Sequence, residues 1–324
     1  MYNISQKYFS GLVFFTKILI ISGAYYIISG RLLDQGGLHG FLTDQARIAF
    51  DLSDYALILL LLLFSLTNWI LEIQKWKSLV TFVEPVSFIS AAKQSLASLT
   101  ASLMTPNRIG EYGAKIIYFP RKERSRILLL NFLGNMNQMG ITLAFGLIGI
   151  AFLWRDLPAT SLQTYPATGF VICLLTIALC LYLFKNKWVA VYHKIKNQYL
   201  KIPAIIHQKT LFYSFLRYLV FSHQFYLFLI FFGVEITYGT AMPLIFLMYL
   251  ISSVIPGFVV FDWLVKGSVA VSLFGFFGMN DMIIVGVTSL MWVLNFALPS
   301  MIGSVFVLQY KGASLMPDKR KISK

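Results

Sequence analysis

Six apolar runs set the strongest limit on the fold of this chain, because each is long enough to cross a lipid bilayer as a helix. They lie near residues 8-29, 52-73, 127-153, 166-185, 212-233 and 281-308. A helix needs about 20 apolar residues to span roughly 30 Å of hydrocarbon. The 324 residues are 58% hydrophobic and 12% charged, whereas soluble domains carry about 25% charged residues. We therefore expect 1-324 to form a single, all-α polytopic membrane domain.

Two further apolar stretches are each interrupted by a proline. The stretch 86-105 ends at Pro106 and the stretch 241-255 ends at Pro256, and a helical pattern resumes after each. Non-helical backbone at membrane depth is tolerated only where it is buried in protein or lines a wet cavity. The pattern therefore predicts two re-entrant helical hairpins, at about 86-119 and 241-279, each returning to the side from which it entered.

Basic residues are distributed very unevenly over the loops of this topology. One side receives eighteen cations: Lys7, Lys75, Lys77, Arg121, Lys122, Arg124, Arg126, Lys185, Lys187, Lys194, Lys196, Lys201, Lys209, Lys311, Lys319, Arg320, Lys321 and Lys324. The other side receives Arg31, Arg47 and Arg155. Cytoplasmic loops are enriched in Lys and Arg, so both termini, including the basic tail 311-324, are predicted to be cytoplasmic. The net charge of +14 then reflects orientation and indicates no nucleic-acid partner.

The remaining six cations fall within predicted membrane segments: Lys17, Lys93, Arg108, Lys115, Arg217 and Lys266. A single Arg, Lys or Asp at the centre of a membrane helix costs about 2.5 to 3.5 kcal/mol on insertion scales. Several such residues in one chain therefore indicate a compensating role.

The order of segments indicates an internal repeat. Residues 1-155 read span, span, hairpin, span, and residues 156-310 repeat this order. Three crossings per half make the second copy inverted, as in many transporters. The hairpin tips also match, because each has a proline, then an acid, then a lysine four residues later: Pro106, Glu111 and Lys115, and Pro256, Asp262 and Lys266. Spacing i,i+4 brings acid and lysine together on one helical face.

Polar residues recur at helical spacing in the spans that follow the hairpins. Asn131, Asn135 and Gln138 share one face of the third span, and Asn295 lies on the corresponding face of the last span. Arg217 faces either a cavity or another helix. For these side chains, contact with a substrate and hydrogen bonding between helices both remain open, since polar residues commonly join membrane helices.

Two motifs resemble a known family. Pro106, Arg108, Gly110 and Glu111 form a Pro-x-Arg-x-Gly-Glu motif before a basic loop, and Trp76 lies between two lysines in a basic-Trp element. In these features the chain resembles the lysylphosphatidylglycerol synthase transmembrane family, which includes the lipid-flipping membrane half of the multiple peptide resistance factor. The resemblance covers nearly the whole chain.

The second hairpin departs from that pattern, because Phe258 to Phe261 stand where relatives are often glycine-rich, and Asp262 stands where they often have Glu. Only a short basic tail follows the last span, so no aminoacyl transfer is expected. The resemblance implies a multi-pass, lipid-translocase-like core in the bacterial inner membrane.

The buried charges suit a lipid head group. Arg108 can bind a phosphate in bidentate fashion, whereas Lys115 and Lys266 would act as point charges. We therefore expect translocation of an anionic or aminoacylated phospholipid, or of a polyprenyl-phosphate-linked lipid. The alternative is that the acid-lysine pairs are only mutually neutralising and hold the hairpins together. Self-association into a homo-oligomer is left open.

Two other classes of function account for parts of the sequence. A membrane glycosyltransferase with a polyprenyl-phosphate donor would use acids in an outer loop, where the chain offers Asp34, Asp44, Asp51 and Asp54. A non-catalytic membrane partner would leave the charged hairpins unexplained. The sequence contains no Walker loop, nucleophile elbow, metal-ligand spacing or dinucleotide fingerprint, so neither enzymatic activity nor a cofactor is expected.

The charge bias predicts that the loop from Arg121 to Arg126 is cytoplasmic. An Arg124→Cys variant, in a background without Cys173 and Cys180, should resist a membrane-impermeant thiol reagent in intact cells and react once the cells are opened. Labelling in intact cells would show that the topology is wrong.

Overall fold

The computed structural model describes residues 22, 26, 52-103, 105, 108-153, 202-255 and 261-310. All regular structure in these residues is helical, and four of the helices are long and apolar enough to cross a membrane. They are α3 (Leu52–Val80), α6 (Arg124–Leu153), α10 (Ala204–Phe231) and a continuous helix from Asp281 to Leu308. Four of the six expected spans are thereby confirmed as long apolar helices, and 8-29 and 166-185 lie outside the described residues.

The long helices carry many large apolar side chains on their outer surfaces. Leu59, Leu63 and Leu66 of α3 are each about half exposed or more, as are Leu147 and Phe152 of α6. Such continuous apolar surface would be costly in water, whereas lipid tails solvate it without penalty. This apolar surface is what we expect of a multi-pass membrane protein whose helices contact lipid.

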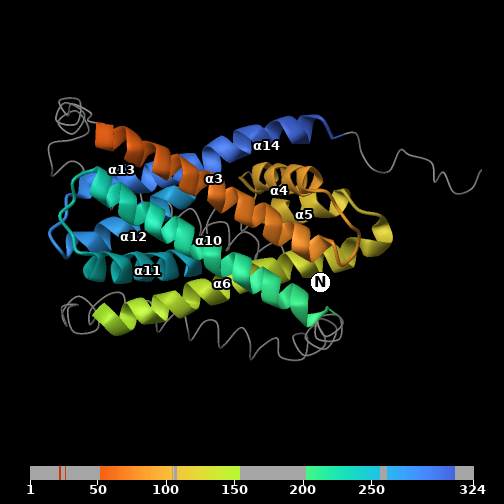
Figure 1. Cartoon of the computed structure of the whole chain (residues 1–324), viewed down its shortest axis with the longest axis horizontal. Helices are drawn as coiled ribbons and strands as arrows, with labels where there is room; N and C mark the ends of the chain where they lie inside the picture. Colours follow the sequence, from red (N-terminus) through yellow and green to blue (C-terminus); the bar gives the residue numbers. More distant parts are fainter. Residues whose placement is uncertain are drawn as a thin grey trace, which may run out of the picture.

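Four shorter helices form two packed pairs. The first pair is α4 (Phe88–Leu103) with α5 (Ile109–Ile117), and the second is α11 (Tyr238–Val254) with α12 (Asp262–Gly275). At 16, 9, 17 and 14 residues, these helices are shorter than the roughly 20 residues of a typical span. They occupy the segments expected to be hairpins. Figure 1 shows the two pairs towards opposite ends of the long helices.

One boundary differs from the sequence-based expectation. The span expected at 52-73 continues as α3 to Val80, so Lys75 and Lys77, which were both counted with the cytoplasmic loops, lie inside a helix. The Lys75 side chain is only 3% exposed and pairs with Glu72, one helical turn earlier. The assignment of Lys75 to a loop was therefore wrong, because an internal ion pair lets an apolar helix continue through a charged segment.

The last long helix contains a π-helical segment, η3 (Val293–Ala297), between α13 (Asp281–Trp292) and α14 (Leu298–Leu308). Pro299 has no N–H, so one carbonyl oxygen in the preceding turn lacks its usual backbone donor. Ser65 donates to the Leu294 oxygen at 2.9 Å and the Trp69 indole N–H donates to the Asn295 oxygen at 3.1 Å. Two side chains of α3 therefore stabilise the irregular backbone.

Close packing of α14 against α4 depends on Gly303. A Cβ at Gly303 would overlap the Leu96 carbonyl and the Thr100 hydroxyl, and Thr100 itself donates to the Ser300 carbonyl at 2.7 Å. Small residues commonly allow such close approach between membrane helices. This contact fixes the position of the α4-α5 pair against the last long helix.

Gly303→Ala should therefore lower the free energy of unfolding by about 1 to 3 kcal/mol through overpacking. Gly140→Ala on α6 is the control, because nothing lies within 4 Å of its added Cβ, and it should be neutral or slightly stabilising. SDS-titration unfolding in mixed micelles measures both variants. Equal effects would contradict the close-packing role of Gly303.

Candidate functional site

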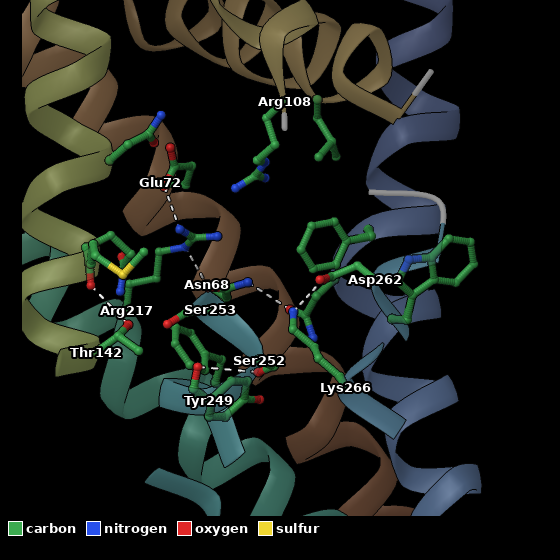
Figure 2. Close-up of a pocket in the computed structure, with 18 of the residues that line it drawn as sticks. Asn68, Glu72, Arg108, Thr142, Arg217, Tyr249, Ser252, Ser253, Asp262 and Lys266 are labelled. Carbon is green, nitrogen blue, oxygen red and sulfur yellow. Dashed lines mark hydrogen bonds and ion pairs between the residues drawn. The ribbon is translucent and has the colours of Figure 1, made fainter. Parts of the chain in front are cut away.

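A cavity of about 580 Å³ lies among the helices and is lined by charged side chains from both helix pairs. Arg108, Glu111 and Lys115 reach it from α5 and the residue before it, and Asp262 and Lys266 reach it from α12. Figure 2 shows Arg108 at one side of this space and Lys266 at the other, with Arg217 between long helices. The charged residues of the two segments expected to be hairpins thus share one cavity.

Lys115 is fully engaged within the protein. Its ammonium donates to Glu111 Oε1 at 2.9 Å and to Asn131 Oδ1 at 2.7 Å, and it lies 4.3 Å from the centre of the Trp76 ring. Trp76 is in turn held by Gln94, whose Oε1 accepts from the indole N–H at 2.7 Å. A lysine has three donors, so Lys115 links α5 to α3 and α6 rather than offering its charge to the cavity.

Arg108 is in a different situation. Its side chain is 41% exposed and its Nε lies 3.6 Å from Glu111 Oε2, which is too long for a hydrogen bond. The guanidinium also lies 5.8 Å from the centre of the Phe296 ring. Its hydrogen-bond donors therefore have no partner among the described residues. Arg108 presents a charged, planar donor group to the cavity.

The backbone at Arg108 is strained. Its φ is 58°, the only positive φ of a non-glycine residue in the described part of the chain. Left-handed backbone costs a residue with a Cβ roughly 1 to 2 kcal/mol. Strain of this kind gathers at functional sites, and here it occurs at the start of α5, where Arg108 lines the cavity.

The second helix pair supplies a more open ion pair. Lys266 and Asp262 are 2.6 Å apart, with side chains 26% and 30% exposed. The Lys266 ammonium lies 5.2 Å from the centre of the Phe296 ring, which Arg108 also approaches. The two cations are therefore separated by no more than about 11 Å. Phe296 belongs to η3, so the π-helical segment lies between the two helix pairs.

A third charged group was missed by the sequence interpretation. Glu72 on α3 forms ion pairs with Lys75, 2.6 Å away, and with Arg217 on α10, 2.9 Å away, and all three side chains are largely buried. Arg217 was expected to face either a cavity or another helix, but its acidic partner was not identified. The i,i+3 spacing of Glu72 and Lys75 at the end of an apolar run could have indicated this pair.

A chain of amides continues from this ion pair to the π-helical segment. Arg217 Nε donates to Asn68 Oδ1 at 2.9 Å, Asn68 Nδ2 donates to Asn295 Oδ1 at 2.8 Å, and Asn295 Nδ2 donates to Gln224 Oε1 at 2.9 Å. Gln224 donates to the Leu61 carbonyl at 2.9 Å. For Asn295, contact with a substrate and bonding between helices were both left open. Its side chain is 6% exposed, lines the cavity and bonds to α3 and α10.

The other predicted residues have varied positions. Asn135 lines the cavity and donates to the Tyr112 hydroxyl at 3.1 Å, and Gln138 lines it and donates to the Ser214 carbonyl at 3.4 Å. Gly110 acts through its lack of a side chain, because a Cβ would overlap the Ala101 carbonyl of α4. Asn131 bonds to Lys115 and does not line the cavity. Pro106 and Pro256 lie outside the described residues.

The cavity carries excess positive charge. Four basic side chains line it, namely Arg108, Lys115, Arg217 and Lys266, against three acids, Glu72, Glu111 and Asp262. Lys75 adds a fifth positive charge directly behind Glu72. All three acids are engaged in ion pairs. The site is therefore suited to an anion, and Arg108 is the cation whose donors are available to it.

Comparison of the chain with models of known protein families, with curated proteins and with solved structures finds no match. The resemblance to the lysylphosphatidylglycerol synthase transmembrane family therefore remains a prediction from the motifs.

Glu72→Gln should destabilise the protein more than Asp262→Asn does. The first change leaves Lys75 and Arg217 buried without a counter-charge, which costs about 3 to 5 kcal/mol, whereas Asp262 and Lys266 form a more accessible pair worth about 1 kcal/mol or less. SDS-titration unfolding in mixed micelles compares the two. Similar losses of unfolding free energy in both variants would show that Glu72 contributes no more to stability than Asp262 does.

Proposed function

We propose that this protein is a lipid translocase, with a core like that of the lysylphosphatidylglycerol synthase transmembrane family. It moves an anionic or aminoacylated phospholipid, or a polyprenyl-phosphate-linked lipid, across the bacterial inner membrane. Six spans and two re-entrant hairpins in an inverted repeat form its membrane domain, with both termini in the cytoplasm. The ligand that the protein meets inside the membrane is the phosphate of the head group.

One observation carries this proposal: Arg108 lines the cavity with a guanidinium that makes no hydrogen bond to the described residues. A charge with unmet donors is expensive inside a membrane protein and usually marks a substrate pathway. The planar guanidinium matches the oxygens of a phosphate, with which it forms two parallel hydrogen bonds. Binding of a lipid phosphate would supply the partners that Arg108 lacks.

The arrangement of the short helices supports transport through this site. Both α5 and α12 begin near the cavity, with Glu111 and Asp262 in their first turns. In many transporters, interrupted helices direct their positively polarised N-termini at an anionic substrate near the middle of the membrane. The location of the two helix pairs towards opposite ends of the long helices (Figure 1) is compatible with hairpins that enter from opposite leaflets.

Exchange of partners gives a mechanism for release. The contact of 3.6 Å between Arg108 and Glu111 is weak enough for a phosphate to displace it and strong enough to re-form when the phosphate leaves. Lys266 can act in the same way, because its pair with Asp262 is partly exposed to the cavity. A lipid phosphate could then pass from Arg108 to Lys266 without leaving either cation unpaired.

Arg108→Gly separates this function from folding. Glycine accepts a positive φ without strain, so the variant should stay within about 1 kcal/mol of wild type in stability. Lipid movement should fall about 10- to 100-fold, because hydrogen bonds to a charged group are lost, and Arg108→Lys should restore it only in part. The assay follows an acyl-NBD phosphatidylglycerol in proteoliposomes by dithionite quenching.

Lys93→Gln is the matched control, since Lys93 belongs to the same helix pair but is exposed and does not line the cavity. Its rate should equal that of wild type. Wild-type rates in Arg108→Gly would reject the role of Arg108.

A further inference from the structure

One part of the cavity, away from Arg108 and beside the pair of Asp262 with Lys266 (Figure 2), is lined by uncharged side chains. This neutral subsite is lined by hydroxyl groups of α6 and α11 and by aromatic rings of α10: Thr142, Tyr249, Ser252, Ser253, Phe221 and Phe225. None of these side chains ionises near neutral pH. Figure 2 shows Tyr249, Ser252 and Ser253 on the side of the cavity away from Arg108. A ligand whose phosphate is at Arg108 would direct the rest of its head group towards this subsite.

Tyr249 supplies a hydroxyl group that is available to a ligand. Its ring is held by Phe221, Tyr218 and Phe225 at centroid distances of 4.7, 6.3 and 6.4 Å. Its hydroxyl makes no hydrogen bond to any described residue and its side chain lines the cavity. Fixed by its neighbours, the ring presents a donor that is organised before any ligand binds.

The serine and threonine hydroxyls supply acceptors. Ser252 donates to the Met248 carbonyl at 2.7 Å, Ser253 to the Leu250 carbonyl at 2.7 Å and Thr142 to the Gln138 carbonyl at 3.0 Å. Each proton is therefore used within its own helix, while the oxygen keeps lone pairs for another donor. The subsite thus combines one free donor with several acceptors, which complements a group that both donates and accepts, namely a hydroxyl.

An amine fits the same subsite poorly. An ammonium needs a counter-charge when it leaves water, and while the phosphate is at Arg108 the three acids that line the cavity stay paired with lysine or arginine. The cavity also carries excess positive charge, which repels a second cation. The charge pattern thus disfavours head groups that end in an ammonium, including aminoacylated ones.

We infer that the neutral subsite holds an uncharged, polyhydroxyl head group joined to the phosphate that Arg108 binds. The ligand class is then a lipid phosphodiester of a polyol or sugar, whether its tail is diacylglycerol or polyprenol. This inference rests on the proposed function, because it takes the phosphate of the ligand to be at Arg108. It narrows the substrate from any lipid phosphate to phosphodiesters of this kind.

Native mass spectrometry of the purified full-length chain with added lipids tests this directly. The probes are dioleoyl phosphatidylglycerol, phosphatidic acid, which lacks the polyol, phosphatidylethanolamine, which replaces it with an amine, and a polyprenyl phosphate hexose. The two hydroxyl-bearing lipids should bind about tenfold more tightly than phosphatidic acid and phosphatidylethanolamine, as expected for one or two added hydrogen bonds. Their relative affinities show which of these two lipids the protein prefers.

Tyr249→Phe should remove most of this preference while leaving the affinity for phosphatidic acid within about twofold of wild type, because only the donor to the head group is lost. Tyr213→Phe on α10 is the control, since Tyr213 does not line the cavity, and it should keep the preference. Ser252→Ala with Ser253→Ala should weaken the preference through loss of acceptors. If one of these variants fails to fold, the other still tests the subsite.

Two readouts separate the inference from the proposed function. Equal binding of phosphatidylglycerol and phosphatidic acid, a preference for phosphatidylethanolamine, or an unchanged preference in Tyr249→Phe would each overturn the polyol subsite. Selective binding without movement of acyl-NBD phosphatidylglycerol in proteoliposomes would support the subsite and overturn the translocase. Absence of binding by every probe would overturn both.

Discussion

The ion pair between Glu72 and Arg217 is the contact on which the rest of the site depends. One carboxylate, shared by Lys75 and Arg217, joins α3 to α10 where both are largely buried. A buried charge is tolerated only when it is paired and hydrogen-bonded, so these two helices have little freedom to separate or rotate here. The amide chain from Asn68 through Asn295 to Gln224 extends the same constraint to the last long helix.

That constraint also explains why an irregular segment can persist in the last helix. Pro299 removes a donor, and η3 would be costly in a lipid-facing helix because freed carbonyls find no water there. Here Ser65 and Trp69 of α3 supply the donors. The irregular turn brings Phe296 between Arg108 and Lys266. π-helical turns occur often at functional sites, and this one places an aromatic face between the cations of two helix pairs.

The sequence predicted the features that depend on local pattern. Long apolar runs gave four described membrane-length helices, and the i,i+4 spacing gave the pairs of Glu111 with Lys115 and Asp262 with Lys266. It did not reveal partners distant in the chain. Glu72 is 145 positions from Arg217 in the sequence. Asn131, which could equally have faced a substrate, instead accepts a hydrogen bond from Lys115. Spacing tells which residues share a helical face, but only packing tells what that face meets.

The two acid-lysine pairs match in sequence but differ in environment. Lys115 bonds to Glu111 and Asn131 beside the Trp76 ring, whereas Lys266 pairs with Asp262 and remains partly exposed. In the first pair the lysine is structural, and the cation open to the cavity is Arg108, which has no counterpart among the described residues of the second pair. The two ends of the cavity therefore offer unequal affinity for a phosphate, because a bidentate guanidinium binds it more strongly than a paired ammonium. If the two helix pairs belong to the two halves of the proposed inverted repeat, this difference would give a lipid phosphate a longer residence at Arg108 than at Lys266.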